Sequence, residues 1–206
     1  MTIVDLRAKI AGDIFSSWEL DALLGGYRNK KAKTAALLRG RGMMKLRHGL
    51  YAFTPPLQSA PLSEGVIANR LYGTSYVSSD FALSYYGLIP EKVTVVTSIS
   101  MGRSRIFTTP VGVFSYRYSR SGAYSIGITT AGRSDRRFLI ATPEKALFDK
   151  VAFDIGFDAV HPERYLTENL RIDPNNLARF DKSVLRELEP FMRGRLRWLY
   201  LYLVGL

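Results

Sequence analysis

The chain has 206 residues, of which 47% are apolar and 23% are charged, and it carries a net charge of +11. This balance is typical of a folded globular protein and argues against extended disorder, while the absence of cysteine excludes disulfides and thiolate zinc sites and fits a reducing compartment. At this length, two modest domains or one large domain are expected.

The positive charge is densest near the N-terminus. Residues 1–60 hold ten Lys and Arg against four Asp and Glu, a balance of +6, whereas residues 61–206 hold nineteen against fourteen, a balance of +5. Eight cations lie between Arg28 and Arg47 without a single carboxylate among them. Such a cluster displaces counterions from a nucleic-acid backbone and so provides affinity for it. A solvated charged helix is the alternative interpretation.

Two helices are predicted at the start of the chain. Apolar residues at helical spacing indicate the first over residues 3–11. The second is predicted over Trp18–Leu24, because Ser16 or Ser17 can cap its first turn and two glycines follow its end. Residues 13–15 are expected to break the helical path between them.

A third helix is predicted from about Asn29 to Arg39, with an amide cap at its start and glycines beyond its end. The residues expected to face inward are Ala32, Ala35 and Leu38. The opposite side then carries Lys30, Lys33, Thr34 and Arg41. Leu37 falls on this cationic side, so the pattern is imperfect.

A hairpin follows the third helix. Two short strands, Met44–Arg47 and Leu50–Phe53, flank His48–Gly49, where the glycine can adopt the positive φ of a tight turn. Three helices and a hairpin in this order describe a winged helix, a variant of the helix-turn-helix. Residues 54–61 are rich in proline and are expected to form a linker. We therefore expect a winged-helix DNA-binding domain over residues 1–58 and a second domain over residues 62–206.

The second domain is expected to combine strands and helices. Helices are predicted over residues 63–72, 78–86, 142–153, 162–170 and 182–203, and strands over residues 92–98, 105–109, 113–118, 124–129 and 137–141. The alternation along residues 113–118 favours antiparallel pairing. The predicted fold class is α+β: an N-terminal winged helix, then a mixed α/β domain with a mainly antiparallel sheet and C-terminal helices.

The longest apolar segment is Trp198–Leu206, whose nine residues are too few to cross a bilayer as a helix. Docking of this last helix into the core is expected, and binding to a membrane surface through the preceding arginines is the alternative. The first residues lack the pattern of a secretion signal. We therefore expect a cytoplasmic protein without a membrane span.

A third helix placed in the major groove of DNA would present its early residues to base edges and its other cations to phosphates. The residues expected to read bases are Lys30, Lys33 and Thr34. Those expected to bind phosphates are Lys31, Arg39 and Arg41. The hairpin is expected to contact the DNA through Lys45, Arg47 and His48. Double-stranded DNA is thus the predicted partner.

Five arginines on or beside the predicted strands form a second candidate surface. Their planar guanidinium groups favour bidentate contact with phosphate or with an acidic protein partner. An ordinary exposed strand face is the alternative. These residues are Arg103, Arg105, Arg117, Arg136 and Arg137.

Catalysis has few candidate residues. The two histidines, His48 and His161, fall in different predicted domains, and no cysteine is present to act as a nucleophile. The glycines form no phosphate-binding loop. We expect no enzyme, no metal and no cofactor. A metal-dependent hydrolase is the alternative, with Asp149, Asp154 and Asp158 as its carboxylates, although no acid is followed two positions later by the lysine that many nucleases use.

Three segments together resemble the AbiEi family of antitoxins and related regulators. Leu38–Tyr51 is similar to the helix-and-wing segment of that family, with basic residues, glycines and a Gly-aliphatic-Tyr ending. Tyr76–Leu88 is similar to the segment that follows the linker. Ala141–Asp149 is similar to the helix with a Pro-Glu-Lys-Ala sequence, and the three segments occur in the family's order.

This resemblance implies a function. Members of the family bind inverted repeats upstream of their own operon through a winged helix and repress it. Their C-terminal domain counters a nucleotidyltransferase-like toxin, as part of a type IV toxin-antitoxin system that acts in phage defence. Similar sequences include stand-alone regulators without a toxin, and a protein-binding module that uses its basic face is a further alternative.

Overall fold

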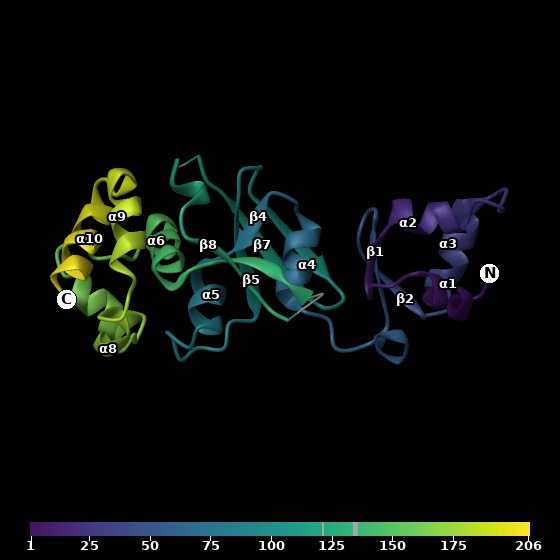
Figure 1. Ribbon diagram of the computed structural model, residues 1–206, viewed down its shortest axis with the longest axis horizontal. Coiled ribbons are helices and arrows are strands. Elements are labelled where there is room, and N and C mark those ends of the chain that lie inside the picture. Colours follow the sequence, from purple (N-terminus) through teal and green to yellow (C-terminus); the bar gives the residue numbers. More distant parts are fainter. Residues whose placement is uncertain (121, 134–135) are drawn as a thin grey trace.

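The computed structural model describes residues 1–120, 122–133 and 136–206. The molecule is elongated, with the N-terminus toward one end and the C-terminal helices at the other (Figure 1). We call residues 1–54 the N-terminal unit and residues 62–153 the central unit. The protein is mixed α/β.

The N-terminal unit contains three helices and three strands, and all of its residues are described. Their order and bounds are α1 Ile3–Lys9, β1 Ile14–Ser16, α2 Ser17–Leu23, α3 Lys30–Arg39, β2 Met43–Arg47 and β3 Leu50–Phe53. The strands form an antiparallel sheet in the order β1-β3-β2. The three predicted helices and the hairpin are confirmed, whereas β1 lies where only a break was expected.

Side-chain caps explain where these helices begin. The Oγ of Ser16 accepts a hydrogen bond from the Glu19 N–H at 3.2 Å, and the Glu19 carboxylate accepts from the Ser16 N–H at 2.7 Å. This reciprocal capping box satisfies two backbone donors at the start of α2. The Asn29 side chain similarly accepts from the Ala32 N–H at 2.9 Å at the start of α3.

The prediction of which side of α3 faces inward was wrong in part: Leu38 packs against the N-terminal hydrophobic cluster as expected, whereas Ala32 and Leu37 are placed the other way round. Leu37 is the buried residue of this helix, and Ala32 is exposed. Lys30 and Lys33, two turns and one turn before Leu37, are half-buried. Long lysine stems can cover apolar surface while the ammonium group stays near water, so their charge did not mark the outer side.

The N-terminal sheet is buried on both faces. Phe15, Met43 and Phe53 pack with α1, α2 and α3 in one hydrophobic cluster. On the opposite face, Ile14, Leu46, Leu50 and Ala52 belong to the large cluster that continues into the central unit. Because successive side chains of a strand point to opposite faces, the two faces of this sheet belong to two different hydrophobic cores.

The described part of the central unit contains six strands in one sheet, in the order β6-β7-β5-β4-β9-β8. Their bounds are β4 Ser75–Val77, β5 Val95–Ser100, β6 Arg105–Thr109, β7 Gly112–Tyr118, β8 Ile128–Ala131 and β9 Phe138–Ala141. The pairs β5–β7 and β4–β9 are parallel and the other pairs are antiparallel. The expected mainly antiparallel sheet is therefore a mixed one, and β4 was not predicted.

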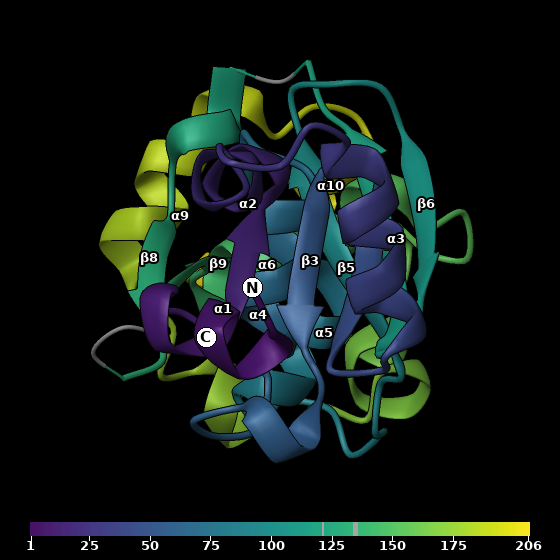
Figure 2. The same cartoon turned by 90° about the vertical axis from the view of Figure 1, so that its right-hand side faces the viewer.

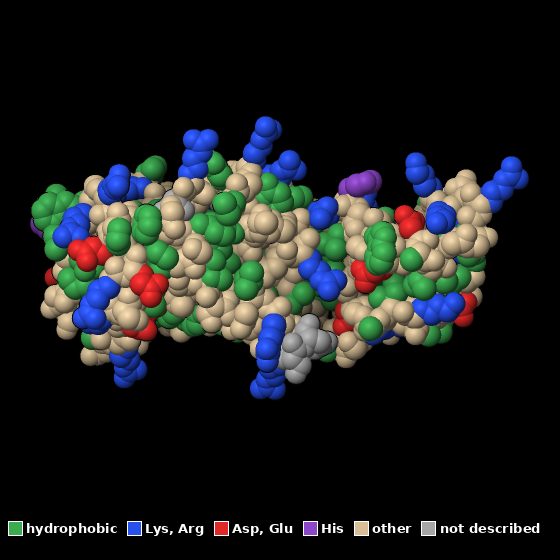
Figure 3. All heavy atoms as spheres, turned by 45° about the horizontal axis from the view of Figure 1, so that its top comes forward, with side chains coloured by type: hydrophobic (Ala, Val, Ile, Leu, Met, Phe, Trp, Pro, Cys, Tyr) green, Lys and Arg blue, Asp and Glu red, His purple; other side chains and the backbone are tan. Residues whose placement is uncertain are grey.

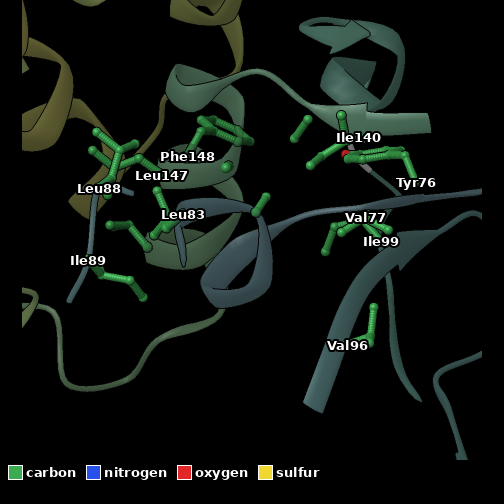
Figure 4. Close-up of a cluster of buried hydrophobic side chains, with 14 of the residues drawn as sticks. Tyr76, Val77, Leu83, Leu88, Ile89, Val96, Ile99, Ile140, Leu147 and Phe148 are labelled. Carbon is green, nitrogen blue, oxygen red and sulfur yellow. The ribbon is translucent and has the colours of Figure 1, made fainter. Parts of the chain in front are cut away.

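Helices cover both faces of this sheet. On one face lies α4 (Glu64–Leu71), where the Tyr116 hydroxyl donates to the Ala68 carbonyl at 2.7 Å. On the other lie α5 (Ser79–Tyr85) and α6 (Pro143–Phe153). Figure 4 shows Leu83, Leu147 and Phe148 meeting in this second layer.

Four polar side chains are enclosed between β4 and α6. The Lys145 Nζ lies 2.8 Å from Asp149 Oδ1, while the hydroxyls of Ser78 and Tyr76 donate to Asp149 Oδ2 at 2.7 and 3.0 Å. Each of the four is at most 1% exposed. The buried carboxylate is therefore neutralised and saturated with donors, as burial of a charge requires.

The C-terminal residues form short helices that pack on α6. Their bounds are α7 Pro162–Arg164, a π-helical turn Tyr165–Asn169, α8 Pro174–Leu177, α9 Lys182–Leu188 and α10 Arg195–Gly205. Leu199 and Leu203 of α10 are buried, so the expected docking of the last helix is confirmed. No helix in the described part of the chain is long and apolar enough to cross a membrane.

Candidate nucleic-acid interface

The outward side of α3 is formed by cations and small residues. Lys31 and Arg39 are exposed, and so are Ala32 and Ala36 between them. These four positions follow the helical repeat and share one side. Alanine offers no bulk that would keep the helix backbone away from a groove. The pattern was missed because alanine in a helix was taken as a sign of core.

Two of the predicted base-reading residues are held against α2 and the loop that follows it. The Lys30 ammonium donates to the Asp21 carbonyl at 3.1 Å, and the Lys33 ammonium lies 5.2 Å from the centre of the Tyr27 ring. Thr34, the third, is half-buried. In this structure, α3 therefore offers Lys31 and Arg39 outward, and it holds these three residues nearer the core.

Arg41 has an unusual backbone conformation. Its φ is 55°, in the left-handed region that glycine usually occupies after a helix. Its N–H donates to the Leu38 carbonyl at 3.0 Å, and its own carbonyl accepts from the Thr54 hydroxyl at 2.8 Å. These bonds fix the arginine at the C-terminal end of α3, where its side chain is exposed.

The hairpin presents its cations at its free end. Lys45, Arg47 and His48 are exposed, and Gly49 takes the expected positive φ, here 76°. The Gly49 carbonyl accepts from the Ser17 N–H at 2.9 Å, which joins the turn to the start of α2. The pairing shifts by one residue between Lys45 and Arg47, a bulge that twists the strand.

The hairpin also lies beside the central unit. Strand β2 contacts β6, and Figure 2 shows α3 and β6 on the same side of the molecule. Burial raises the pKa of the Tyr116 hydroxyl, and the positive charge of Arg47 opposes this rise. The charge of the hairpin therefore acts on the buried Tyr116 hydroxyl of β7.

The five arginines of the second candidate surface do not form one cluster. Arg103, Arg105 and Arg117 are exposed at or near β6 and β7, at one edge of the sheet. Arg136 and Arg137 precede β9, which lies beyond β4 toward the other edge. Sequence distance could not reveal this separation, because the strand order is not the chain order.

Lys and Arg side chains project from both long edges of the face shown in Figure 3, and others lie between them. Glutamate and aspartate are visible on the same face as smaller, separate spots.

A metal-dependent hydrolase was the alternative prediction. Among the described residues, no group of three or more His, Cys, Asp and Glu side chains is placed to hold a metal ion. Asp149 is enclosed with Lys145, and Asp154 is paired with Lys150 at 3.0 Å. Both histidines are exposed. The structure thus places Asp149 and Asp154 in separate ion pairs.

One serine has a geometry that could suit a nucleophile. Ser79 is the first residue of α5, with a φ of 52°, and it lines a cavity together with Lys150. Burial acts to lower the pKa of Lys150, but hydrogen bonds from it to Asp80 and Asp154 outweigh this effect and raise the pKa above its usual value. Lys150 is thus engaged by two carboxylates, Asp80 at 2.8 Å and Asp154 at 3.0 Å.

Comparison of the sequence with models of known protein families and with curated proteins found no match.

Proposed function

We propose that this protein binds double-stranded DNA through its N-terminal unit and represses transcription from its own promoter. The observation that carries the proposal is the pair of exposed basic elements, α3 and the β2–β3 hairpin, which present Lys31, Arg39 and Arg47 without any carboxylate between residues 28 and 47. Such a surface gains affinity by releasing counterions from the phosphate backbone.

The arrangement of the N-terminal unit supports a winged helix. Its helices and strands follow the order α1-β1-α2-α3-β2-β3, and β1 pairs with the edge of β3 that faces away from β2. In a winged helix of this order, the third helix enters the major groove and the hairpin is the wing. We assign α3 as the recognition helix and residues 47–49 as the tip of the wing.

The proposed contacts divide by role. Lys31, Arg39 and Arg41 bind phosphates, and Lys45, Arg47 and His48 contact the DNA from the wing. Lys30, Lys33 and Thr34 read base edges only if the two lysines leave Asp21 and Tyr27. A lysine side chain that ends in a flexible ammonium group can make this change at small cost, since its contact in the free protein is one hydrogen bond or one ring.

We further propose that the C-terminal part, residues 62–206, acts as an antitoxin. This proposal rests on the three segments that resemble AbiEi antitoxins, with a nucleotidyltransferase-like toxin as the partner. The exposed Arg103, Arg105 and Arg117 suit an acidic partner surface. Arg117 and Arg136 each use one donor within the chain, on the Phe153 carbonyl at 3.2 Å and the Pro61 carbonyl at 3.1 Å, and keep others for a partner.

A gel-shift titration tests the DNA-binding part. The full chain should retard a duplex from the region upstream of its own gene at physiological salt, and a duplex of equal length and shuffled sequence should require at least tenfold more protein. Absence of any retardation would refute DNA binding. Equal retardation of both duplexes would refute sequence-specific repression.

Co-expression tests the antitoxin part separately. If a nucleotidyltransferase-like gene lies next to this one and its product is toxic when expressed alone, co-expression of this full chain should relieve the toxicity. We expect residues 62–206 to be responsible for this effect. If the full chain retards the promoter but does not relieve toxicity, the protein is a stand-alone regulator.

A further inference from the structure

A cavity lies at the junction between the N-terminal and central units. Its walls come from the loop between α1 and β1, from the loop before α4, from α4 itself and from the segment before β9. Its volume is about 270 Å³, slightly below the ~300–1,000 Å³ of most ligand pockets. It therefore suits a small molecule.

The walls of this junction cavity are divided between apolar and cationic groups. Ile14, Leu62 and Val66 supply apolar surface, while Arg70 and Arg136 bring guanidinium groups to the rim. The Arg70 guanidinium donates to the Ile14 carbonyl at 2.5 Å and the Arg136 guanidinium to the Pro61 carbonyl at 3.1 Å. Since a guanidinium has five N–H donors, each arginine keeps donors for a ligand.

The charge around the cavity is not balanced. Asp13 is the carboxylate among the lining residues, and its oxygens accept from the Ser59 N–H and hydroxyl at 2.9 and 2.7 Å. Arg7 and Arg136 lie 3.4 and 3.7 Å from the same carboxylate. Among the described residues that line the cavity, Arg70 and Arg136 thus face one saturated carboxylate, so the lining carries one more positive than negative charge.

We propose that the junction cavity binds a small organic anion with an apolar body, such as an aromatic or branched-chain carboxylate. The carboxylate is held by Arg70 and Arg136, and the apolar body lies on Leu62 and Val66. Bidentate contact with arginine gives this recognition its geometry. Ile14 of the N-terminal unit adds to the apolar wall, so the bound anion contacts both units and stabilises the arrangement of the two units described here. The inference does not depend on DNA binding.

Benzoate, benzamide and acetate form a matched set of probes for the full chain. Benzamide has the shape of benzoate without its charge, and acetate has its charge without the ring. Isothermal titration should give saturable binding of benzoate, with at least tenfold weaker binding of the other two. Limited proteolysis should also cut the linker at residues 55–61 more slowly with benzoate present. Equal affinity for benzoate and benzamide, or no benzoate binding up to tens of millimolar, would overturn the proposal.

Two substitutions locate the site. Arg70→Gln removes the charge, and Val66→Phe fills the cavity while keeping both arginines. Each should weaken benzoate binding by about tenfold or more, which corresponds to about 1.4 kcal/mol. Arg137→Gln is the control, since this neighbouring arginine is exposed and does not line the cavity. If Val66→Phe folds normally and binds benzoate as well as the unmodified chain, the ligand lies elsewhere.

Discussion

Arg41 occupies the backbone position at which many helices end in glycine. A non-glycine residue in the left-handed region costs about 1–2 kcal/mol, and neighbours on both sides of Arg41 are glycines that could have taken this conformation. The chain keeps a cation there at the expense of stability. Such a choice is expected where the side chain serves binding.

The substitution Arg41→Gly separates these two effects. It should raise the free energy of unfolding by about 1 kcal/mol, because glycine adopts positive φ without strain, and it should weaken DNA binding. Urea unfolding and gel-shift titration measure the two quantities. Arg41→Lys keeps the charge and the strain, so it should change neither by much. A loss of stability in the glycine variant would contradict this account.

Lys31 tests the phosphate contacts of α3. Lys31→Gln should reduce the slope of log affinity against log salt concentration by about one unit, since one fewer counterion is released. Fluorescence anisotropy at several salt concentrations gives this slope. Lys92→Gln removes an exposed lysine far from the N-terminal unit and should leave the slope unchanged. An identical slope for both variants would remove Lys31 from the interface.

Asp154 gives the fold a defined dependence on acid. Burial acts to raise its pKa, but hydrogen bonds from Tyr165 and Lys150 outweigh it and hold the pKa at about 2. The pKa in an unfolded chain is ~3.9. Because the folded value is the lower one, this carboxylate stabilises the fold above pH ~4, and that contribution is lost as the pH falls toward 2.

The variant Asp154→Asn should therefore unfold more easily at neutral pH, by about 1–2 kcal/mol after allowance for solvent screening. The difference from the unmodified chain should shrink between pH 4 and pH 2. Urea unfolding at pH 7, 4 and 2.5 measures it. Glu187→Gln, on the exposed side of α9, is the control without such a difference. A difference that is constant with pH would show that charge is not the cause.

At the scale of elements, α6 is held by the buried ion pair rather than by apolar packing alone. Lys145 and Asp149 are one helical turn apart, and Lys145 also lies 4.6 Å from the centre of the Phe148 ring. Removing one partner leaves the other charge buried, which costs about 3–5 kcal/mol. Replacing both by apolar residues costs less than the sum of the single changes.

Lys145→Met should accordingly lower the free energy of unfolding by about 3–5 kcal/mol, because Asp149 keeps only the hydroxyl donors of Ser78 and Tyr76. Addition of Asp149→Leu should recover part of this loss. Urea unfolding of the two single variants and the double variant completes the cycle. Strictly additive losses would show that the two residues are not coupled.

At the scale of the whole molecule, the N-terminal sheet connects two hydrophobic cores. Its outer face carries Ile14, Leu46, Leu50 and Ala52, all less than 8% exposed in the full chain. Asp13 strengthens the connection between the two units. Its carboxylate accepts a hydrogen bond from the Ser59 hydroxyl of the linker and lies near the Arg136 guanidinium of the central unit. The N-terminal unit therefore depends on the central unit for part of its burial.

A fragment of residues 1–58 should melt at a lower temperature than the full chain or should self-associate, because this face would be exposed to water. Circular dichroism and size-exclusion chromatography measure both. Replacing Leu46 and Leu50 by threonine should reduce the self-association of the fragment. A monomeric fragment with the melting temperature of the full chain would contradict the shared core.

Features that depend on residues close together in the sequence were predictable, whereas features that depend on distant residues were not. Helix caps at Ser16 and Asn29, the turn at Gly49 and the helix after Thr142 depend on residues three or four positions apart, and all four were recognised. The strands β1 and β4 have three residues each. Three residues cannot display a period, so neither was predicted.

The composition and order of the sequence alone determined the basic N-terminal segment, the helices and the hairpin, since charge and local hydrogen bonding need no distant partner. Only the tertiary structure decided which side of α3 is outward, that Arg136 lies away from Arg105, and that a cavity opens between the units. Those outcomes depend on which elements become neighbours. That choice is made by burying apolar surface from the whole chain at once, and no local pattern records it.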